Sequence, residues 1–336
     1  MTYPKVSIII LNYNSKEYLA NCLDTVKKLE YPNYEVIVVD NASTDDSVSY
    51  IQNNLHSIKL IKNLKNLGYA KANNEAAKKA NGEFLLFLNA DTWIKPNLLN
   101  ELVSTITVNP NAGVCACTQL SYDGTQWLNS GITTDLFAYP MNPKNKEKIL
   151  YSDGASLFVK RFVFNQVGGF DPAYFMYGED VDLCWRILLG GYDIVVAKSA
   201  IVGHKSAGTS ASSGKTYYTN KLRRYLAERN SFRTLLKNYS AFTLLYILPL
   251  RSIIMIQATF FFLIKRSDFS IVEIKAVFWN LKKLKETFAL RYVVQKNRKV
   301  SDRIIMMKMS KDVGMARALA IIQQNSLGIN WGTNKT

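Results

Sequence analysis

Acidic side chains stand at three separated points of the sequence, each at the boundary of a patterned segment. Asp40 ends one apolar run, Asp91 follows another at the step Asn89-Ala90-Asp91, and Glu179-Asp180 opens a helical pattern. An enzyme that displaces a diphosphate leaving group can use three carboxylates. One holds a divalent cation, one binds a nucleotide and one accepts a proton. The pattern predicts an enzyme that transfers a group from a nucleotide carrier, of the kind a sugar transferase requires.

The first two acidic points differ in the ligand that each can bind. Asp91 offers the hard oxygen ligands that Mg²⁺ or Mn²⁺ prefers, and Asn89 stands where a second carboxylate often lies. Asp40 can accept a hydrogen bond from the imide N–H of a uracil or thymine ring, and Tyr13 can stack on that ring. Two alternatives stay open: Asp91 as a helix cap near Pro96, and Asp40 as a turn residue.

The third acidic point predicts the proton acceptor. Asp180 lies at a predicted helix N-terminus, where the helix dipole and free N–H groups keep a carboxylate ionised, so we expect it to be the general base. Glu179 is the second candidate, and Asp182 is expected to pair with Arg186 one turn along. His204 follows an apolar strand and is a candidate metal ligand, with a packed or surface histidine as the alternative.

Alternating strands and helices are expected to position these residues. Apolar runs predict strands at 6–11, 34–40, 58–61, 84–88, 154–159, 194–197 and 200–204, and the patterns between them predict helices at 16–29, 66–81 and 180–189. This order predicts a parallel sheet covered on both faces, with ligands beyond the carboxyl ends of its strands. The turn-rich residues 118–150 resemble a mobile substrate loop more than a scaffold.

Charge divides the chain into two unequal parts. A chain of 336 residues that is 48% hydrophobic can bury one large core plus an appendage. Residues 1–204 carry 18 Lys and Arg against 20 Asp and Glu, whereas residues 205–336 carry 24 against 6. The four cysteines show no disulfide pattern, which predicts a reduced cytosolic compartment, and Cys115 and Cys117 are expected to be core residues.

The basic part also contains the most apolar run, at 241–264, preceded by a basic helical pattern at 221–230. The run is about long enough to span a bilayer, but Pro249, Arg251 and Gln257 interrupt it. We expect a broken or interfacial helix pair in one leaflet, on an anionic surface; a true span and a soluble packing helix are the alternatives. Nucleic acid is excluded as a partner because an apolar run would be out of place there and no recognised motif is present.

Taken in order, these motifs resemble the inverting family 2 glycosyltransferases of the GT-A fold, in particular their rhamnosyltransferase-like branch. The resemblance covers roughly residues 4–240 and is carried by 6–14, 38–45, 66–68 with Asn73, 88–91, 168–171, 179–183 and 202–204. It implies an α/β domain at 1–215, with a Rossmann-like, mostly parallel sheet and flanking helices. A basic, apolar, helical membrane-associating region would follow at 216–336.

The resemblance also implies roles for single residues. Asp180 would be the catalytic base, with Glu179 beside it, and Asp91 and His204 would hold Mg²⁺ or Mn²⁺. The residues expected to bind the nucleotide sugar are Asn12, Tyr13, Asp40, Gly68, Lys71, Asn89 and Asp91.

The activity that the resemblance implies is inverting transfer from dTDP-rhamnose or a UDP-sugar to a glycan or lipid-linked acceptor in cell-surface polysaccharide synthesis. The expected location is the cytoplasmic face of the cell membrane, as a peripheral or monotopic protein. One alternative is a sugar nucleotidyltransferase, which would be expected to carry a Gly-rich, basic loop after the first strand, where this chain has Asn12-Tyr13-Asn14-Ser15. The other is a non-catalytic membrane scaffold that retains the fold.

Overall fold

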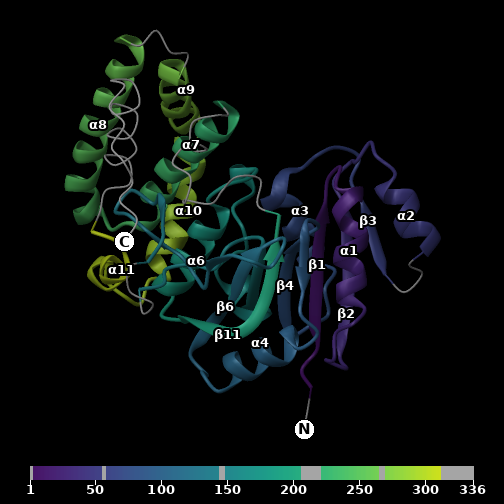
Figure 1. Cartoon of the computed structure of the whole chain (residues 1–336). Helices are drawn as coiled ribbons and strands as arrows, with labels where there is room; N and C mark the ends of the chain where they lie inside the picture. The colour runs from purple at the N-terminus through teal and green to yellow at the C-terminus, as the bar shows by residue number, and fades with distance from the viewer. Residues whose placement is uncertain (1–2, 55–57, 144–147, 206–220, 265–268, 312–336) are drawn as a thin grey trace, which may run out of the picture.

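A mixed sheet of nine strands forms the centre of the protein (Figure 1). The computed structural model describes residues 3–54, 58–143, 148–205, 221–264 and 269–311. The strand order is β3-β2-β1-β4-β10-β6-β11-β5, with β7 paired to β6. The strands are β1 (Val6–Asn12), β2 (Tyr34–Asp40), β3 (Lys59–Lys62), β4 (Phe84–Asn89), β5 (Thr92–Ile94), β6 (Ala112–Ser121), β7 (Trp127–Asn129), β10 (Ser156–Lys160) and β11 (Asp193–His204).

The first four strands form the parallel half that the sequence predicts. A helix joins each strand to the next: α1 (Lys16–Val26), α2 (Ser47–Asn54) and α3 (Gly68–Ala77). The register sets Asn12 opposite Asp40 and Leu11 opposite Asn89, so the carboxyl ends of β1, β2 and β4 share one edge. Helix α1 ends three residues before the predicted end, because the chain tightens into a turn in which the Lys28 N–H bonds the Thr25 carbonyl.

The other half of the sheet reverses direction, which the sequence does not predict. β10 lies antiparallel between β4 and β6, whereas β11 runs parallel to β6 and antiparallel to β5. As a result, the start of β10 lies beside the end of β4, and the Asn89 N–H donates to the Ala155 carbonyl at 3.0 Å. Residues that precede β10 therefore reach the same edge as the ends of the parallel strands.

Alternate residues of the strands feed two cores, one on each face of the sheet. Ile8 and Ile10 pack with α1 and α4 (Leu98–Thr107), and Ile9 and Phe87 pack on the opposite face. That opposite face is covered by α3, α5 (Arg161–Gln166) and α6 (Glu179–Leu189). Cys115 and Cys117 are buried in the first of these cores, and burial raises the pKa of each thiol to about 12, so the prediction of core cysteines is confirmed.

The described part of residues 118–150 belongs to the scaffold. The prediction that these residues form a substrate loop and not a scaffold is therefore wrong for this part. β6 continues to Ser121, and β8 (Thr133–Thr134) pairs with β9 (Pro140–Met141). Asp135 is fully buried and accepts hydrogen bonds from the backbone N–H groups of Phe137 and Tyr139 at 2.8 and 3.0 Å. Its carboxylate thus replaces regular ladder bonds and organises a turn within the core.

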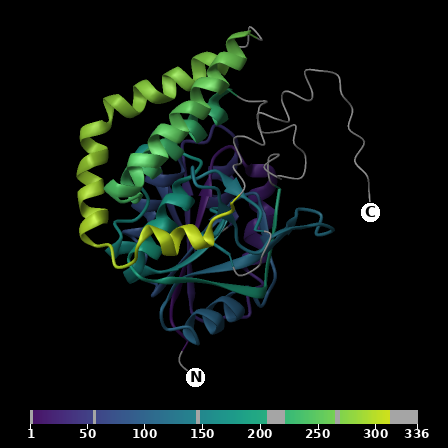
Figure 2. The ribbon, with the colours of Figure 1, turned by 90° about the vertical axis from the view of Figure 1, so that its left-hand side faces the viewer.

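Within the described residues from 221 to 311, five helices form a layer beside the sheet. Figure 2 shows α9, α10 and α11 following one another around the edge of that layer. The five helices are α7 (Lys221–Asn238), α8 (Ala241–Ile264), α9 (Phe269–Lys282), α10 (Leu284–Lys296) and α11 (Asp302–Lys308). α7 is the innermost and packs against α6, α9 and α10. The predicted division at 215/216 lies outside the described residues.

Helix α8 is continuous, so the break expected in the apolar run is wrong. Pro249 lies inside the helix on its exposed side. Arg251 points the other way and is buried, where its Nη2 donates to Ser231 Oγ at 2.9 Å and pairs with Glu228 at 3.4 Å. The arginine therefore fastens α8 to α7.

A buried ion network joins α6, α7 and the turn before α6. Asp171 accepts from Arg233 Nε at 2.8 Å and from Lys237 Nζ at 2.6 Å. Lys237 also binds Asp182 at 2.9 Å, and Asp182 pairs with Arg186 at 2.9 Å, as the sequence predicts. Burial raises the pKa of Asp171, but the charges of Lys237 and Arg233 outweigh it and hold that pKa below its usual range.

Replacing Asp171 with Ala is expected to destabilise the fold, because Arg233 and Lys237 would keep their charge in a buried site with one partner fewer. We expect a loss of about 3 kcal/mol in the free energy of unfolding at pH 7, measured by urea denaturation. Since the folded pKa is lowered, the contribution of Asp171 is present above its unfolded pKa and is lost as the pH falls. The exposed Asp24, paired with Lys27 at 3.4 Å, is the control, and a similar loss for Asp24→Ala would contradict the prediction.

Candidate active site

The end of β2 is held by Asp40, whose carboxylate is buried. Its Oδ1 accepts from Asn12 Nδ2 at 2.9 Å, and its Oδ2 accepts from the Ser43 N–H at 3.1 Å. Among the described residues, Asn12 Oδ1 is buried without a hydrogen-bond donor, and the neighbouring Tyr13 side chain is half exposed. A nucleobase could donate an N–H to the unpaired oxygen of Asn12 and stack on the exposed ring of Tyr13.

A row of amide contacts connects this end of the sheet to the start of α3. Asn41 Nδ2 donates to Asn66 Oδ1 at 2.8 Å, and Asn41 Oδ1 accepts from the Leu67 N–H at 2.9 Å. Gly68 has φ +76°, and a Cβ there would lie 2.5 Å from the Phe175 carbonyl oxygen, so only glycine fits. The absence of a side chain at Gly68 thus allows the backbone before α6 to approach the start of α3. Lys71, further along α3, is exposed.

The carboxylate of Asp180 is held by backbone groups and remains partly exposed. Its Oδ2 accepts from the Gly154 N–H at 2.9 Å and its Oδ1 from the Val181 N–H at 2.8 Å. Burial, followed by the charge of Asp153, raises the pKa of Asp180 to about 7, against the lowering effect of the N–H groups. The expectation of a fully ionised carboxylate is therefore wrong: desolvation outweighs the helix N-terminus, and Asp180 titrates near neutral pH.

Glu179 is buried, whereas Asp180 next to it is partly exposed. Burial and the charge of Asp180 raise its pKa well above the usual range, and its Oε2 has no hydrogen-bond partner among the described residues. Burial therefore favours the neutral form of the Glu179 carboxyl, whereas Asp180 has a pKa of about 7. Of the two candidates, the geometry favours Asp180 as the proton acceptor.

Asp153 is a third carboxylate at this place that sequence reasoning missed. It immediately precedes Gly154, whose carbonyl accepts from Tyr69 Oη at 2.5 Å. Its charge raises the pKa of Asp180 and Glu179, and it also contributes to the shift at His204. The charge of Asp153 thus acts both on the Asp180 carboxylate and on the His204 ring.

Asp91 and His204 form the second group. His204 Nε2 lies 3.3 Å from Asp91 Oδ1, because β5 follows Asp91 directly and pairs with the end of β11, setting Thr92 opposite His204. Burial lowers the pKa of His204, but the hydrogen bond and charge of Asp91 outweigh it, so that pKa is raised. Asn89 is half buried at the end of β4.

The donor atoms of this pair suit a divalent cation. A carboxylate oxygen and an imidazole nitrogen are ligands that Mn²⁺ accepts, and Mg²⁺ is often bound by one or two carboxylates together with substrate phosphates. In the part of the chain that the structure describes, no group of three or more His, Cys, Asp or Glu residues could hold a metal. The residues present therefore fit a partial shell that a diphosphate would complete.

The segment that leads into Asp180 is held from α7, which sequence reasoning also missed. Phe175, Tyr177 and Gly178 all have φ between 65° and 83°. Asn230 Nδ2, on α7, donates to the carbonyl oxygens of Tyr174, Met176 and Tyr177 at 3.1, 2.9 and 2.7 Å. A left-handed segment is costly for non-glycine residues, so these bonds fix the approach to the candidate base.

Comparison with known sequences gives a matching family model and many similar proteins, among them the following three. A family model for glycosyl transferase family 2 matches residues 7–168. Glycosyltransferase AglE of Haloferax volcanii is 32% identical over 60% of this chain and 67% of its own length. N-acetylglucosaminyl-diphospho-decaprenol L-rhamnosyltransferase of Mycobacterium tuberculosis is 25% identical, over 67% of this chain and 84% of its own. O-antigen biosynthesis protein RfbC of Myxococcus xanthus is 30% identical over 62% of this chain, which spans 18% of that relative's length.

Comparison with solved structures supports the fold. A mannosyltransferase from Pyrobaculum calidifontis, solved with GDP-Man and Mn²⁺, matches with a TM-score of 0.57 and 18% identity, over 98% of this chain and 89% of that one. At this identity the likeness concerns the fold alone. The mixed α/β fold of GT-A type, with a central sheet and flanking helices, is thereby confirmed.

Proposed function

Because the chain belongs to glycosyl transferase family 2, we propose that it moves a sugar from a nucleoside-diphosphate sugar to a glycan or lipid-linked acceptor, with inversion at the anomeric carbon. The observation that carries the proposal is Asp180, a partly exposed carboxylate whose pKa of about 7 suits a general base at neutral pH. Tyr69 Oη donates to the carbonyl of Gly154, whose N–H holds Asp180, and the charge of Asp153 acts on both Asp180 and His204. No observation favours the nucleotidyltransferase or the non-catalytic scaffold.

In the proposed reaction, Asp180 accepts the proton of the acceptor hydroxyl while that oxygen forms a bond to the anomeric carbon. The bond from this carbon to the diphosphate breaks, and the nucleoside diphosphate leaves with the electron pair. The chain's own residues shape each part of this step. The N–H groups of Gly154 and Val181 orient the base, and burial together with the charge of Asp153 keeps the pKa of Asp180 high enough to take a proton.

The donor is proposed to be dTDP-rhamnose or a UDP-sugar. Both bases carry an imide N–H, for which Asp40 and the unpaired Asn12 Oδ1 are acceptors, and Tyr13 offers a face for stacking. The rhamnosyltransferase relative supports the first of these sugars. Gly68, Lys71 and Asn89 lie along the same edge and remain predicted contacts of the donor.

A divalent cation, Mg²⁺ or Mn²⁺, is proposed as the cofactor, and Asp91 and His204 would hold it. When bound, such a cation supplies positive charge opposite the diphosphate oxygens as negative charge gathers on them. The short contact between the two side chains supports this assignment. The mannosyltransferase of similar fold was solved with Mn²⁺.

We place the protein on the cytoplasmic face of the cell membrane, as a peripheral or monotopic protein. The segment Ala241–Phe260 of α8 has a mean hydropathy of 1.6 and is 28% buried, so it is long and apolar enough to cross a membrane by composition. Arg251 fastens this helix to α7 from within the fold, which favours α8 lying on one leaflet over crossing it. Its exposed apolar side chains include Phe242, Leu245, Ile253, Ile256 and Phe260.

The proposal is tested with a panel of nucleotide sugars, including dTDP-rhamnose, UDP-GlcNAc, UDP-glucose and GDP-mannose. The full chain is incubated with Mg²⁺ or Mn²⁺ and a membrane lipid extract, and release of nucleoside diphosphate is measured. We expect a dTDP- or UDP-linked sugar to be consumed at least about 10-fold faster than GDP-mannose, because a guanine ring presents a different edge to Asp40. If no sugar in the panel is consumed, the proposed function is wrong.

A further inference from the structure

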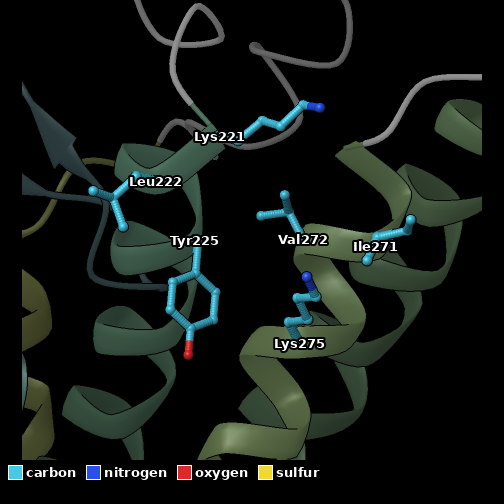
Figure 3. Close-up of a pocket in the computed structure, with 6 residues that line it drawn as sticks. All are labelled: Lys221, Leu222, Tyr225, Ile271, Val272 and Lys275. Carbon is cyan, nitrogen blue, oxygen red and sulfur yellow. The ribbon is translucent and has the colours of Figure 1, made fainter.

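A cavity of about 520 Å³ opens between α7 and α9, at a distance from the acidic residues described above (Figure 3). Its walls come from the first described turns of α7 and from the start of α9. The side chains that line it are Lys221, Leu222, Tyr225, Ile271, Val272 and Lys275.

The lining combines apolar surface with positive charge. Figure 3 shows the Tyr225 ring and the Lys275 ammonium group in the gap between the two helices. Leu222 and Ile271 are each more than half exposed, at 56% and 51%. None of the described residues that line the cavity is acidic. The neighbouring Glu273 turns into the protein, where it accepts from Arg224 Nε at 2.9 Å and is buried.

Such a lining selects an amphiphilic anion. Two ammonium groups and a phenol match a doubly ionised diphosphate, since charge-assisted hydrogen bonds to phosphate oxygens are among the strongest that side chains make. Leucine, isoleucine and valine side chains match a branched hydrocarbon chain by burial of apolar surface. A free nucleotide or a soluble sugar would leave the apolar part of the cavity unused.

The two helices that form the cavity contact other parts of the protein on either side. On one side, α9 continues with the exposed apolar residues Ile274, Phe278 and Leu281, and it packs against α8. On the other side, Arg223 of α7 lies over the Tyr177 ring at 5.4 Å, and Tyr177 is three residues before Asp180. The cavity therefore stands between the apolar helix faces and the segment that carries the candidate base.

We propose that the cavity between α7 and α9 binds the diphosphate and the first isoprenoid units of a lipid-linked acceptor. This inference rests on the proposed function and adds the place where the acceptor is held. Lys221 and Lys275 bind the diphosphate oxygens, and Leu222, Ile271 and Val272 contact the hydrocarbon. The sugar of the acceptor then extends along α7 toward Asp180.

Binding of farnesyl diphosphate to the full chain tests the inference without requiring activity. Isothermal titration is expected to show saturable binding that the double variant Lys221→Ala/Lys275→Ala weakens at least about 10-fold, because two charge-assisted contacts are lost. The matched control is Lys282→Ala/Lys285→Ala, which removes two exposed lysines outside the cavity and is expected to bind as the wild type does. Inorganic pyrophosphate and farnesol, each one half of the probe, are expected to bind at least about 10-fold more weakly.

The outcomes separate this inference from the proposed function. An equal loss of farnesyl diphosphate binding in both double variants, or no loss in either, would overturn the inference. It would also be overturned if phosphatidylglycerol vesicles displaced farnesyl diphosphate and this displacement required Lys221 and Lys275. The cavity would then be a general site for lipid headgroups. If farnesyl diphosphate binds as expected but no nucleotide sugar is consumed, the proposed function fails and the lipid-diphosphate site stands. If a sugar is transferred but the probe does not bind, only this inference fails.

Discussion

Asp180→Asn is expected to lower kcat by about 10³-fold while changing the KM for the donor less than about twofold. The variant keeps the shape of the side chain and can still accept one backbone N–H bond, but an amide cannot take the proton of the acceptor hydroxyl. The contacts of Asp180 are with the N–H groups of Gly154 and Val181, so donor binding is not expected to depend on its charge. Steady-state kinetics with the donor identified by the panel measure both constants.

The pH dependence of the wild type provides a second test of the same residue. Because burial raises the pKa of Asp180 to about 7, the base is protonated below that pH, and kcat/KM is expected to fall about 10-fold per pH unit there. Glu179→Gln is the matched control, since burial favours the neutral form of Glu179 and the substitution should leave the acidic limb in place. Retention of more than about a tenth of the activity by Asp180→Asn would rule out its role as the base.

Asp91→Ala is expected to lower kcat/KM by about 10²- to 10³-fold, because the cation that neutralises the diphosphate would lose its carboxylate ligand. Removal of divalent cations by a chelator should produce a similar loss in the wild type and little further loss in the variant. His204→Ala is expected to have a smaller effect, since imidazole is the weaker ligand for these cations. The exposed Asp24→Ala serves as the control and should leave both activity and the response to the chelator unchanged.

Asp91→Ala has a readout that does not depend on turnover. The chain contains two histidines, so the ring protons of His204 can be followed by NMR through a pH titration. In the wild type, Asp91 raises the pKa of His204 above its ordinary value, and the variant is expected to lower it. A variant with an unchanged His204 titration and full activity would show that Asp91 belongs neither to a metal site nor to this pair.

The parallel half of the sheet was predictable because its signals are local. β1 to β4 are short apolar runs separated by helical patterns, and such runs pair in parallel and end at one edge. The ends of β2 and β4, at Asp40 and Asn89, therefore lie at one edge of the sheet, as expected from sequence. Their hydrogen-bond partners were not predictable, because contacts such as Asn12 with Asp40 join residues 28 positions apart and depend on register.

Asp153 could not be found from sequence because of the direction of one strand. An acid that precedes a strand of a parallel sheet lies at the edge opposite the ligand site. β10 runs antiparallel to β4, so its start lies at the ligand edge, and nothing in the run from Ser156 to Lys160 distinguishes the two directions. The signal available in the sequence was the pair Asp153-Gly154 before an apolar strand. This pair indicates a site residue only when the direction of that strand is known.

The part played by α7 was hidden by its composition. Basic residues beside an apolar run predict contact with anionic lipid, and many of the exposed side chains of α8 and α9 are apolar. Arg233 and Lys237, however, are fully buried and bind Asp171 across the helix interface. Charge counts alone cannot separate a cation that meets lipid from one that pairs inside the fold, because both use the same residue types.

The anomeric configuration of the first product formed is the most direct test of the central claim, that Asp180 activates an acceptor for a single displacement at the nucleotide sugar. In a single displacement the acceptor oxygen attacks from the side opposite the diphosphate. Proton NMR of the product, recorded before any anomeric exchange, is therefore expected to show the configuration opposite to that of the donor. A product with the donor's own configuration would contradict the account, because retention requires a different mechanism from the one that this base supports.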